Sequence, residues 1–323
     1  MSATITEDIT IAASALREGK LVAIPTETVY GLGANALDLD AVAGIFAAKN
    51  RPAFDPLIIH QANAEKILCY ASEVPAAARK LATACWPGPL TLVLPKAANV
   101  PHLVTAGLPT VALRVPAHPL TQQLLSKLDF PVAAPSANPF GYVSPTTAEH
   151  VADQLGDKID VILNGGACEV GLESTIVGFP DGVPTVLRKG GLAVETLSAM
   201  LGQPLAVKTH SSSAPAAPGM LSKHYSPGVE MVLLGTKSAV FTPISAADAL
   251  ITFGEYWRPS GSPEYDIYNL SVSGNLKEAA ANLFATLRTI AKANYRKVYV
   301  NEVPEQGLGR AINDRLRRAA AVE

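Results

Sequence analysis

Two hydrophobic patterns alternate along about the first 190 residues of the chain. Ile9, Ala13 and Leu16 recur at helical spacing, and the run at residues 21–24 that follows is short, apolar and β-prone. Helices are predicted near residues 9–16, 42–49, 62–71, 76–85, 119–127 and 146–155, and strands near residues 21–24, 57–60, 90–94, 110–115, 131–134, 160–163, 174–177 and 185–187. Because helices and strands alternate, the chain is predicted to have an α/β fold.

A second, smaller α/β pattern occupies the last part of the chain. Strands are predicted at residues 231–234, 249–253 and 297–300, and a periodic helix at about residues 276–293. Between residues 210 and 228 the sequence is rich in Ser, Ala and Pro, which is typical of a connector. The predicted organisation is a first domain at residues 1–207, a linker at 208–229 and a second domain at 230–323.

The composition is that of a globular protein and argues against two kinds of partner. Of the 323 residues, 48% are hydrophobic, which is enough for two packed cores. Only 17% are charged and the formal net charge is -2, so no general positive field attracts nucleic acid or an anionic membrane. No apolar run has the length of a bilayer span, and the start of the chain, with Glu7 and Asp8, differs from a signal peptide. The expected compartment is the cytoplasm.

The three cysteines, Cys69, Cys85 and Cys168, are odd in number and have no paired short spacing. A disulfide framework and a structural zinc site are therefore not expected, and free thiols are predicted. Cys168 lies in a Gly-rich loop, but no histidine is near it in the sequence, so a nucleophilic role is not predicted.

The densest group of polar residues overlaps the end of the apolar run at residues 21–24. Residues 24–33 read Ile-Pro-Thr-Glu-Thr-Val-Tyr-Gly-Leu-Gly, so a strand end carries two threonines, a glutamate and a tyrosine. Loops at strand ends of open α/β sheets commonly offer side chains and backbone N–H groups to ligands. A glycine-terminated turn explains the glycines but not the Thr and Glu positions before them. Both a turn and a ligand site stay open for this segment.

Cations also stand beside predicted element ends. The helix that Asp38 or Asp40 can cap ends in Lys49-Asn50-Arg51-Pro52, which suits phosphate, although cations also favour helix C-termini through the macrodipole. Arg114 lies among apolar strand residues and needs an anionic partner, either a ligand or a structural carboxylate.

Hydroxyl, amide and cationic groups recur after later strands, in Ser136-Ala137-Asn138, Glu173-Ser174-Thr175 and Arg188-Lys189-Gly190-Gly191. An Asx turn alone resembles the first of these, but the repetition favours one shared site. The linker ends in Pro-Gly-Met-Leu-Ser-Lys-His-Tyr-Ser-Pro at residues 218–227, which fits either a spacer or a segment that folds back over a site. In the second domain, the glycines of residues 307–312 fit either an anion site or helix packing.

Six motifs follow one another in a recognisable order. They are Pro-Thr-Glu-Thr-Val-Tyr-Gly-Leu-Gly at 25–33, Lys-Asn-Arg-Pro at 49–52, Trp-Pro-Gly-Pro-Leu-Thr at 86–91, Ser-Ala-Asn at 136–138, Glu-Ser-Thr-Ile-Val at 173–177 and Lys-His-Tyr-Ser-Pro at 223–227. With these motifs the chain resembles the two-domain form of the YrdC family of threonylcarbamoyl-AMP synthases. The resemblance covers nearly the whole chain. In the first domain the resemblance is specific, because it rests on these motifs. In the second domain, outside residues 307–316, only the position and the coarse pattern match.

The resemblance implies a YrdC-like twisted open mixed sheet with flanking helices, joined to a smaller Rossmann-like α/β domain. It also implies a nucleotidyltransferase that converts L-threonine, bicarbonate and ATP into threonylcarbamoyl-AMP and pyrophosphate, for N6-threonylcarbamoyladenosine in tRNA. The nucleophile is an N-carboxylate, which needs no strong general base but must approach a polyphosphate. Fixed cations and dipoles have to stabilise that approach, which agrees with the Lys, Arg, Ser, Thr and Asn residues at the strand ends.

The resemblance also assigns roles to single residues, in three sets. The catalytic set is Lys49, Arg51, Ser136 and Asn138. The threonine-binding set, in which Arg114 forks onto the substrate carboxylate, is Thr28, His60, Arg114, Ala134 and Ser174. The ATP-binding set is Arg51, Asp55, Thr110, Ser136, Ser144, Arg188 and Tyr225. Many relatives have Asn where this chain has Asp55, and a carboxylate there repels phosphate unless a cation offsets it.

Mg²⁺ is expected to arrive with ATP, since no dedicated ligand cage is visible, and no metal ligand in the protein and no organic cofactor are implied. The linker is expected to close over the bound substrates and to keep water from the adenylate. The product is expected to pass to tRNA threonylcarbamoyl-transfer proteins, whereas membrane binding and tight binding of long RNA are not expected.

Two other classes of function compete with this interpretation. A non-catalytic RNA-binding module would also use a cationic hollow, but the net charge is negative and only 6% of the residues are aromatic. A related carbamoyl-adenylate enzyme would use another amine or carbamoyl donor. Pyrophosphate release that requires both threonine and bicarbonate supports the synthase, whereas RNA binding without such release supports the module.

Overall fold

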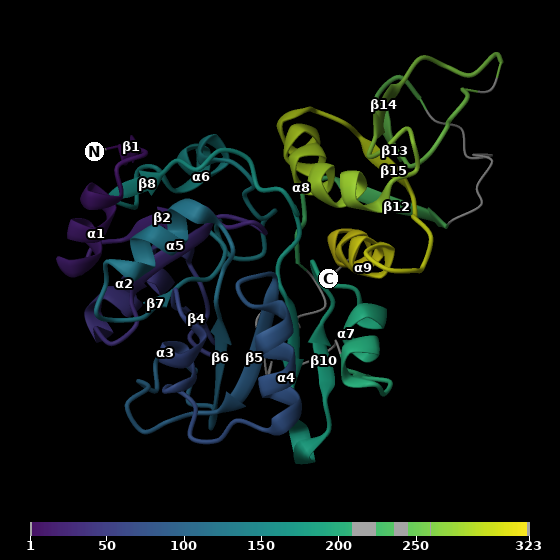
Figure 1. The fold of residues 1–323 in the computed structure, drawn as a ribbon. Helices are drawn as coiled ribbons and strands as arrows, with labels where there is room; N and C mark the ends of the chain where they lie inside the picture. Colours follow the sequence, from purple (N-terminus) through teal and green to yellow (C-terminus); the bar gives the residue numbers. More distant parts are fainter. Residues whose placement is uncertain (1, 209–223, 236–244, 259, 322–323) are drawn as a thin grey trace.

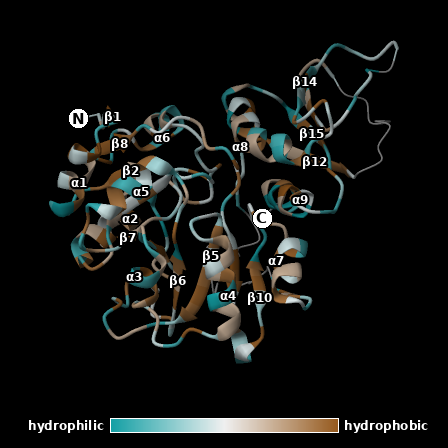
Figure 2. Cartoon of the chain, viewed as in Figure 1, coloured by the Kyte–Doolittle hydropathy of each residue, from teal (hydrophilic) through white to brown (hydrophobic). Residues whose placement is uncertain are grey.

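The computed structural model describes residues 2–208, 224–235, 245–258 and 260–321, which form two sheets with helices around them (Figure 1). The larger sheet belongs to the first part of the chain, and the smaller one lies beside it with helices α8 (Leu276–Lys292) and α9 (Gly309–Ala319). Figure 2 shows hydrophobic residues concentrated in strands of the larger sheet, such as β5 (Leu90–Pro95), while the helices around them mix both kinds of residue.

The larger sheet has eleven strands among the described residues. In spatial order they are β1 (Thr4–Thr6), β8 (Val161–Leu163), β2 (Val22–Ile24), β3 (Gly31–Asn35), β7 (Val132–Ala133), β4 (Ile58–His60), β6 (Thr110–Arg114), β5, β9 (Thr175–Gly178), β10 (Thr185–Arg188) and β11 (Ala206–Val207). β4 and β6 run parallel, as do β5 and β9, whereas β7 pairs antiparallel with both β3 and β4. The predicted mixed α/β sheet is confirmed.

Helices cover both faces of this sheet. Apolar residues of α1 (Ile9–Arg17) and α5 (Pro119–Ser126) pack on one face with residues of β2, β7 and β8. A larger apolar cluster covers the opposite face. It contains residues of α2 (Leu39–Lys49), α3 (Ala64–Leu68), α4 (Ala76–Cys85), α6 (Ala148–Leu155) and α7 (Val194–Leu201). A short 3₁₀ helix, η1 (Pro180–Gly182), connects β9 and β10.

Strand alternation places the polar residues of β4 and β6 on the face that carries α1 and α5. Ile59 belongs to the larger cluster, whereas Ile58 belongs to a small cluster on the other face with Val93, Ala112, Ile176 and Leu187. His60 and Arg114 follow Ile58 and Ala112 at a spacing of two, so they point to that same second face. They stand at the ends of two parallel neighbouring strands.

The loop that carries Arg51 is set by the end of α2. Asp38 caps the start of this helix by accepting from the backbone N–H groups of Asp40 and Ala41, which confirms one of the two predicted caps. At the other end Asn50 is left-handed, with φ 51°. Asn adopts this conformation more readily than other residues with a Cβ atom, so the helix stops there and the chain turns toward β4.

The smaller sheet is entirely parallel among the described residues, in the order β12 (Glu230–Gly235), β15 (Lys297–Asn301), β13 (Asp248–Thr252) and β14 (Asp266–Asn269). Buried residues of α8 and α9 pack with it in one cluster. The second, smaller α/β domain that the sequence predicts is therefore present.

The two sheets are joined by packing as well as by the chain. Val29, Val143 and Leu172 of the first part belong to the same apolar cluster as the buried residues of α8. Arg288 on α8 donates to the backbone oxygen of Val143 at 2.6 Å and to that of Ser144 at 3.2 Å. Burial lowers the pKa of Arg288 to about 10, so its guanidinium stays charged at neutral pH. The two carbonyl oxygens accept hydrogen bonds from it.

The sequence did not predict β1, β3, β11, β14 or α7. The most informative of these is β3, because a glycine-terminated turn was one of the two interpretations of residues 24–33. Gly31 and Gly33 instead begin a strand between β2 and β7. A Cβ atom on Gly33 would lie 3.0 Å from Val132 Cγ1 and 3.1 Å from Val22 O, so the neighbouring strands leave no room for a side chain.

The larger sheet ends with β11 and the smaller one begins with β12. Most of the predicted linker, residues 209–223, lies outside the described residues, and so does the lysine of the sixth motif. The proposed division into residues 1–207, 208–229 and 230–323 stays a prediction.

Candidate active site

A pocket lies where four strands of the larger sheet end or begin on one edge. His60, Arg114 and Arg188 are the last residues of β4, β6 and β10, and Ser174 directly precedes β9. The residues that line the pocket are Thr26, Val29, Gly31, Arg51, Asp55, Ile58, His60, Arg114, Ala134, Pro135, Ser136, Glu173, Ser174, Arg188, His224 and Tyr225. Three of them are arginines, so the pocket suits anionic ligands.

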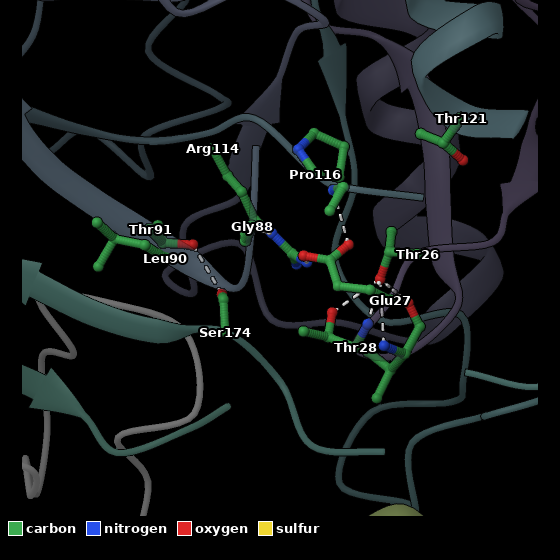
Figure 3. A network of polar contacts seen from close by, with 12 residues as sticks. Thr26, Glu27, Thr28, Gly88, Leu90, Thr91, Arg114, Pro116, Thr121 and Ser174 are labelled. Atoms are coloured by element: carbon green, nitrogen blue, oxygen red, sulfur yellow. Dashed lines mark hydrogen bonds and ion pairs between the residues drawn. The ribbon is translucent and has the colours of Figure 1, made fainter. Parts of the chain in front are cut away.

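Arg114 is held by a glutamate from the segment at residues 24–33. Arg114 Nη2 donates to Glu27 Oε1 at 2.7 Å, and the two side chains face each other in Figure 3. The backbone N–H of Ala117 donates to the second carboxylate oxygen of Glu27 at 3.0 Å. Burial acts to raise the pKa of Glu27, but Arg114 and the hydrogen bonds outweigh it and the pKa is lowered. Arg114 thus has a structural carboxylate partner and still lines the pocket.

Thr26, rather than Thr28, lines the pocket in this segment. The two hydroxyl oxygens lie 2.7 Å apart, and Thr26 Oγ1 donates to Val29 O at 2.6 Å (Figure 3). The backbone N–H groups of Thr28 and Val29 in turn donate to Thr26 Oγ1 at 3.2 Å. Thr28 is fully buried and fixes the loop together with Thr26.

His60 is a neutral group in the pocket wall. Burial, and then the positive charge of Arg114, lower its pKa to about 3. Its Nδ1 lies 3.1 Å from the carbonyl oxygen of Ile58. Backbone hydrogen bonds at Ile58 and Val132 act to raise the pKa of His60, but burial and Arg114 outweigh them.

Lys49 lies buried behind the loop that contains Ser136 and Asn138. Its Nζ donates to Ser136 O at 2.6 Å and also to Asn138 O. Burial, and then the neighbouring Arg51, hold the pKa of Lys49 well below its usual value. Three residues of the predicted catalytic set are therefore joined by direct contacts.

Arg51 and Asp55 form a buried ion pair, with Arg51 Nη2 at 3.0 Å from Asp55 Oδ2. Burial raises the pKa of Asp55, although Arg51 and Lys49 oppose this. The second oxygen, Asp55 Oδ1, is buried without a hydrogen-bond partner in the described structure, and so is Asn138 Oδ1. The Asn138 amide is oriented by its Nδ2, which donates to Pro139 O at 2.8 Å and Tyr142 O at 3.0 Å. The pocket region thus holds two unsatisfied oxygen acceptors among several cations.

Ser174 connects two strands at the pocket. Its hydroxyl lies 2.7 Å from Thr91 Oγ1 (Figure 3) and accepts from Arg188 Nη2 at 3.1 Å. The backbone oxygen of Ser174 also accepts from Arg188 Nε at 3.1 Å and Nη2 at 3.0 Å. Burial lowers the pKa of Arg188 to about 10, which leaves it a cation at neutral pH.

Glu173 links the pocket to the second domain. Its Oε1 accepts from Ser144 Oγ at 2.6 Å, and its Oε2 lies 3.0 Å from Nε of Arg315, a residue of α9. Burial acts to raise the pKa of Glu173, but Arg315, Arg188 and the Ser144 hydroxyl outweigh it and lower the pKa to about 2. Glu173 is therefore ionised at neutral pH.

The end of the linker returns to the pocket. His224 and Tyr225 line it, and their ring centroids lie 4.0 Å apart. Tyr225 is 1% exposed and stacks on Phe284 of α8 at 5.5 Å. Burial raises the pKa of Tyr225 to about 12, and burial lowers that of His224 to about 3. This end of the linker is thus built into the site, as expected for a segment that folds back.

The structure brings most of the predicted site residues together. Those that line the pocket are Arg51, Asp55, His60, Arg114, Ala134, Ser136, Ser174, Arg188 and Tyr225. Lys49, Asn138, Thr28 and Ser144 each contact a lining residue. Thr110 stands apart, because it begins β6 opposite Pro95 while Arg114 ends that strand.

Several residues of the site were not in the predicted sets, among them Thr26, Glu27, Glu173, His224 and Arg315. Glu27 and Glu173 belong to recognised motifs, but carboxylates do not suggest an anion site until their arginine partners are known. His224 precedes the predicted Tyr225 in the sixth motif. Arg315 gave no usable signal, since α9 carries four arginines and only the packing shows that Arg315 and Arg318 are buried and that Arg315 contacts Glu173.

The cysteines are free, as predicted. Burial raises the pKa of Cys168 to about 12, which agrees with the absence of a nucleophilic role. No group of three or more His, Cys, Asp or Glu side chains that could hold a metal occurs in the described part of the chain. None of the helices there combines the length and apolar character that a membrane span needs.

Two family models together match most of the chain. The model described as "Telomere recombination" matches residues 14–190, and the one described as "Threonylcarbamoyl-AMP synthase, C-terminal domain" matches residues 192–321. The chain is 44% identical to the threonylcarbamoyl-AMP synthase of Pyrococcus abyssi, with 97% of this chain and 94% of that relative covered. It is 38% identical to the enzyme of the same name from Bacillus subtilis, with 96% and 92% covered.

Solved structures agree with these matches. The P. abyssi Sua5 structure complexed with L-threonine is similar with a TM-score of 0.89 at 40% identity, and covers 99% of this chain and 97% of that one. The Escherichia coli YciO structure has a TM-score of 0.53 at 25% identity, and covers 59% of this chain and 96% of that one. The first match extends over both sheets.

Proposed function

The chain belongs to the threonylcarbamoyl-AMP synthase family, and we propose that it converts L-threonine, bicarbonate and ATP into threonylcarbamoyl-AMP and pyrophosphate for tRNA modification. The observation that carries this proposal is the convergence of Arg51, Arg114 and Arg188 on one pocket, with Lys49 directly behind it. A non-catalytic RNA-binding module is not favoured. The relatives from P. abyssi and B. subtilis are named as enzymes, and the match covers 94% and 92% of their lengths.

The reaction needs two anions to meet. The amine of threonine combines with bicarbonate and loses water, which gives an N-carboxylate. An oxygen of this carboxylate attacks the α-phosphorus of ATP, the bond from that phosphorus to the bridging oxygen of the β-phosphate breaks, and pyrophosphate leaves with the electron pair. The attacking group is already ionised, so the protein has to supply position and positive charge rather than a strong base.

The threonine end of the pocket is proposed to lie at Arg114 and His60. Arg114 would fork onto the substrate carboxylate, while Glu27 keeps the guanidinium in place. His60 lines the same pocket as a neutral imidazole, which would contact the threonine hydroxyl. Ser174 and the main chain at Ala134 would complete this end, and Thr28 would act through Thr26.

The ATP end is proposed to lie at Arg51, Ser136 and Arg188. These residues line the same pocket as Arg114, so the triphosphate would lie beside the threonine carboxylate. Lys49 fixes the backbone of Ser136 and Asn138 and adds a buried charge where negative charge develops in the transition state. Ser144, Asp55 and Tyr225 are proposed to border the nucleotide, and Thr110 has the least support from the geometry.

Asp55 Oδ1 and Asn138 Oδ1 are each buried without a partner in the described structure, and an oxygen acceptor of this kind would suit a magnesium ion that accompanies ATP, since Mg²⁺ prefers oxygen ligands and keeps several waters. The surrounding cations disfavour a metal without the triphosphate, so we propose that the two arrive together. Bound Mg²⁺ would neutralise phosphate charge. The carboxylate of Asp55, which departs from the family pattern, is paired with Arg51.

Three further elements belong to this proposal. The adenylate product is proposed to pass to proteins that transfer the threonylcarbamoyl group to tRNA. The cytoplasm is the proposed compartment. The linker is proposed to close over the substrates, although residues 209–223 lie outside the described part of the chain.

The test is pyrophosphate release from ATP by the purified protein, with product detection by mass spectrometry. Release is expected only when L-threonine and bicarbonate are both present, together with a product of the mass of threonylcarbamoyl-AMP. Release that continues after bicarbonate is removed, or that accepts any amino acid equally, would contradict the proposal. RNA binding without pyrophosphate release would support the module instead.

A further inference from the structure

We propose that Arg315 is a positioning residue of the active site: the second domain uses it to hold Glu173, so that this carboxylate does not draw Arg188 away from ATP. The inference rests on the proposed function, because it assigns Arg188 to the nucleotide. It gives the second domain a task in the reaction of the first.

Arg315 is unusual in its burial. It lies on α9, whose position between the smaller sheet and α7 is visible in Figure 1, and it is 0% exposed. An arginine rarely loses all its water unless its charge and donors are satisfied. The placement therefore indicates a specific arrangement of partners.

Those partners come from both domains. Arg315 Nη1 lies 2.7 Å from Asp314 Oδ2 on its own helix. Across the interface, Nε lies 3.0 Å from Glu173 Oε2, and Nη2 donates to Lys189 O at 2.8 Å. The guanidinium carbon also stands 5.1 Å from the ring centroid of Tyr225. Two of these contacts are to pocket residues and one is to the neighbour of Arg188.

Glu173 is the residue through which Arg315 acts on the pocket. It directly precedes Ser174, whose backbone oxygen and hydroxyl accept from Arg188. The electrostatic influence of Glu173 reaches Arg188, and that of Arg315 reaches it as well. A buried carboxylate seeks the nearest cation. Arg315, from the second domain, forms this ion pair with Glu173. Glu173 therefore competes only weakly with ATP for Arg188.

Removing the charge of Arg315 should redirect Glu173 toward Arg188. ATP would then compete with a buried carboxylate for the same guanidinium, and its affinity would fall. Threonine, which is assigned to Arg114, should be affected much less. A selective loss of affinity for ATP distinguishes this role from a general loss of packing, which would weaken the binding of both substrates.

The experiment uses the full chain and four variants. Arg315→Met keeps much of the apolar bulk beside Tyr225 but removes the charge. Glu173→Gln removes the competing carboxylate, and the double variant Arg315→Met/Glu173→Gln removes both. Arg310→Ala is the matched control, because Arg310 also lies on α9 and reaches across to Glu195, at 2.9 Å, but Glu195 does not line the pocket.

Binding of ATP and of L-threonine is measured by titration calorimetry, and KM and kcat by pyrophosphate release. Arg315→Met is expected to weaken ATP binding about tenfold or more, the size of one lost charge-assisted contact, with threonine binding changed less than about threefold. The double variant should bind ATP more tightly than Arg315→Met alone, and Arg310→Ala should match the wild type. Thermal melting checks that each variant is folded.

Several results would overturn the proposal. One is that Arg315→Met weakens the binding of ATP and of L-threonine equally. Another is that the double variant binds ATP no more tightly than Arg315→Met. If the single variant does not fold, the folded double variant is compared with Glu173→Gln, and unequal ATP affinities would contradict a role through Glu173. Wild-type protein that binds ATP but releases no pyrophosphate would contradict the proposed function, while the binding data would still decide the role of Arg315.

Discussion

Arg114 Nη2 lies 2.7 Å from Glu27 Oε1, and the two side chains are only 5% and 9% exposed. The guanidinium that is proposed to receive the threonine carboxylate is thus already oriented before substrate binds. A lysine at this position carries the same charge but cannot bind a carboxylate and Glu27 with one planar group.

Arg114→Lys is therefore expected to raise the KM for L-threonine by about tenfold or more, with a much smaller change in the KM for ATP. Steady-state pyrophosphate release at varied threonine and at varied ATP measures both constants. An equal rise of the two would show that Arg114 acts on the fold of the pocket rather than on threonine.

Lys49 is proposed to stabilise charge in the transition state. Lys49→Ala removes a buried ammonium and leaves Ser136 O and Asn138 O without this donor. We expect kcat to fall about 100-fold or more, a loss typical of a removed electrostatic donor, while the circular dichroism spectrum stays that of the wild type. Lys20→Ala, at a half-exposed residue paired with Glu18, is the control and should be fully active. Near-normal turnover in Lys49→Ala would remove the role assigned to this residue.

The lowered pKa of Lys49 predicts that ATP binding depends on pH. Burial depresses this pKa in the free protein, and a nearby triphosphate should raise it again. Binding then favours the protonated lysine, so ATP affinity should be highest below the pKa of the free protein and should fall as the pH rises through it. Where the pH lies between the pKa of Lys49 in the free protein and its pKa in the complex, ATP binding should take up protons.

Titration calorimetry in two buffers with different ionisation enthalpies measures this uptake. The apparent binding enthalpy should differ between the buffers for the wild type, and this difference should be smaller for Lys49→Met. Equal enthalpies for the wild type across the alkaline range would contradict the prediction.

Glu173 makes a second pH dependence testable, this time in stability. Its pKa is about 2 in the folded protein against an ordinary value of 4.5, since Arg315, Arg188 and Ser144 outweigh the effect of burial. A lowered folded pKa gives stability that is present above pH 4.5 and is lost as the pH falls toward 2. The full contribution is on the order of 3 kcal/mol.

Urea unfolding of the wild type and of Glu173→Gln between pH 6 and about pH 2 isolates this contribution, because other groups titrate in both proteins. The free energy of unfolding of the wild type should fall more steeply with acid than that of the variant. Parallel curves would mean that Glu173 is not held ionised by its neighbours.

Much of the larger domain was predictable because its elements carry their own local signals. α2 has a capping Asp38 and a stop at Asn50, and the apolar runs of β2, β6 and β8 are short and bounded. β3 was missed for a physical reason: its glycines are required by the close approach of β2 and β7, which no local pattern records. The two-residue strand β11 has too little sequence to show a period.

The site was predictable where the chemistry stands next to a strand end. His60, Arg114 and Ser174 come together because of the strand order. β4 pairs with β6, β6 with β5 and β5 with β9, so the strand ends that carry these residues lie near one another. The partners that hold them were not predictable, since Glu27 and Arg114 are 87 residues apart and Glu173 and Arg315 are 142 apart. Such pairs follow from tertiary packing, and so does the choice of Arg315 among the arginines of α9.

One pocket is proposed to hold threonine and ATP side by side, with threonine at Arg114 and ATP at Arg51 and Arg188. A crystal structure with L-threonine and a non-hydrolysable ATP analogue tests it most directly. The threonine carboxylate is expected on Arg114 and the triphosphate along Arg51, Ser136 and Arg188, with the threonine nitrogen facing the α-phosphate. Density that places the nucleotide outside this pocket, or threonine away from Arg114, would contradict it.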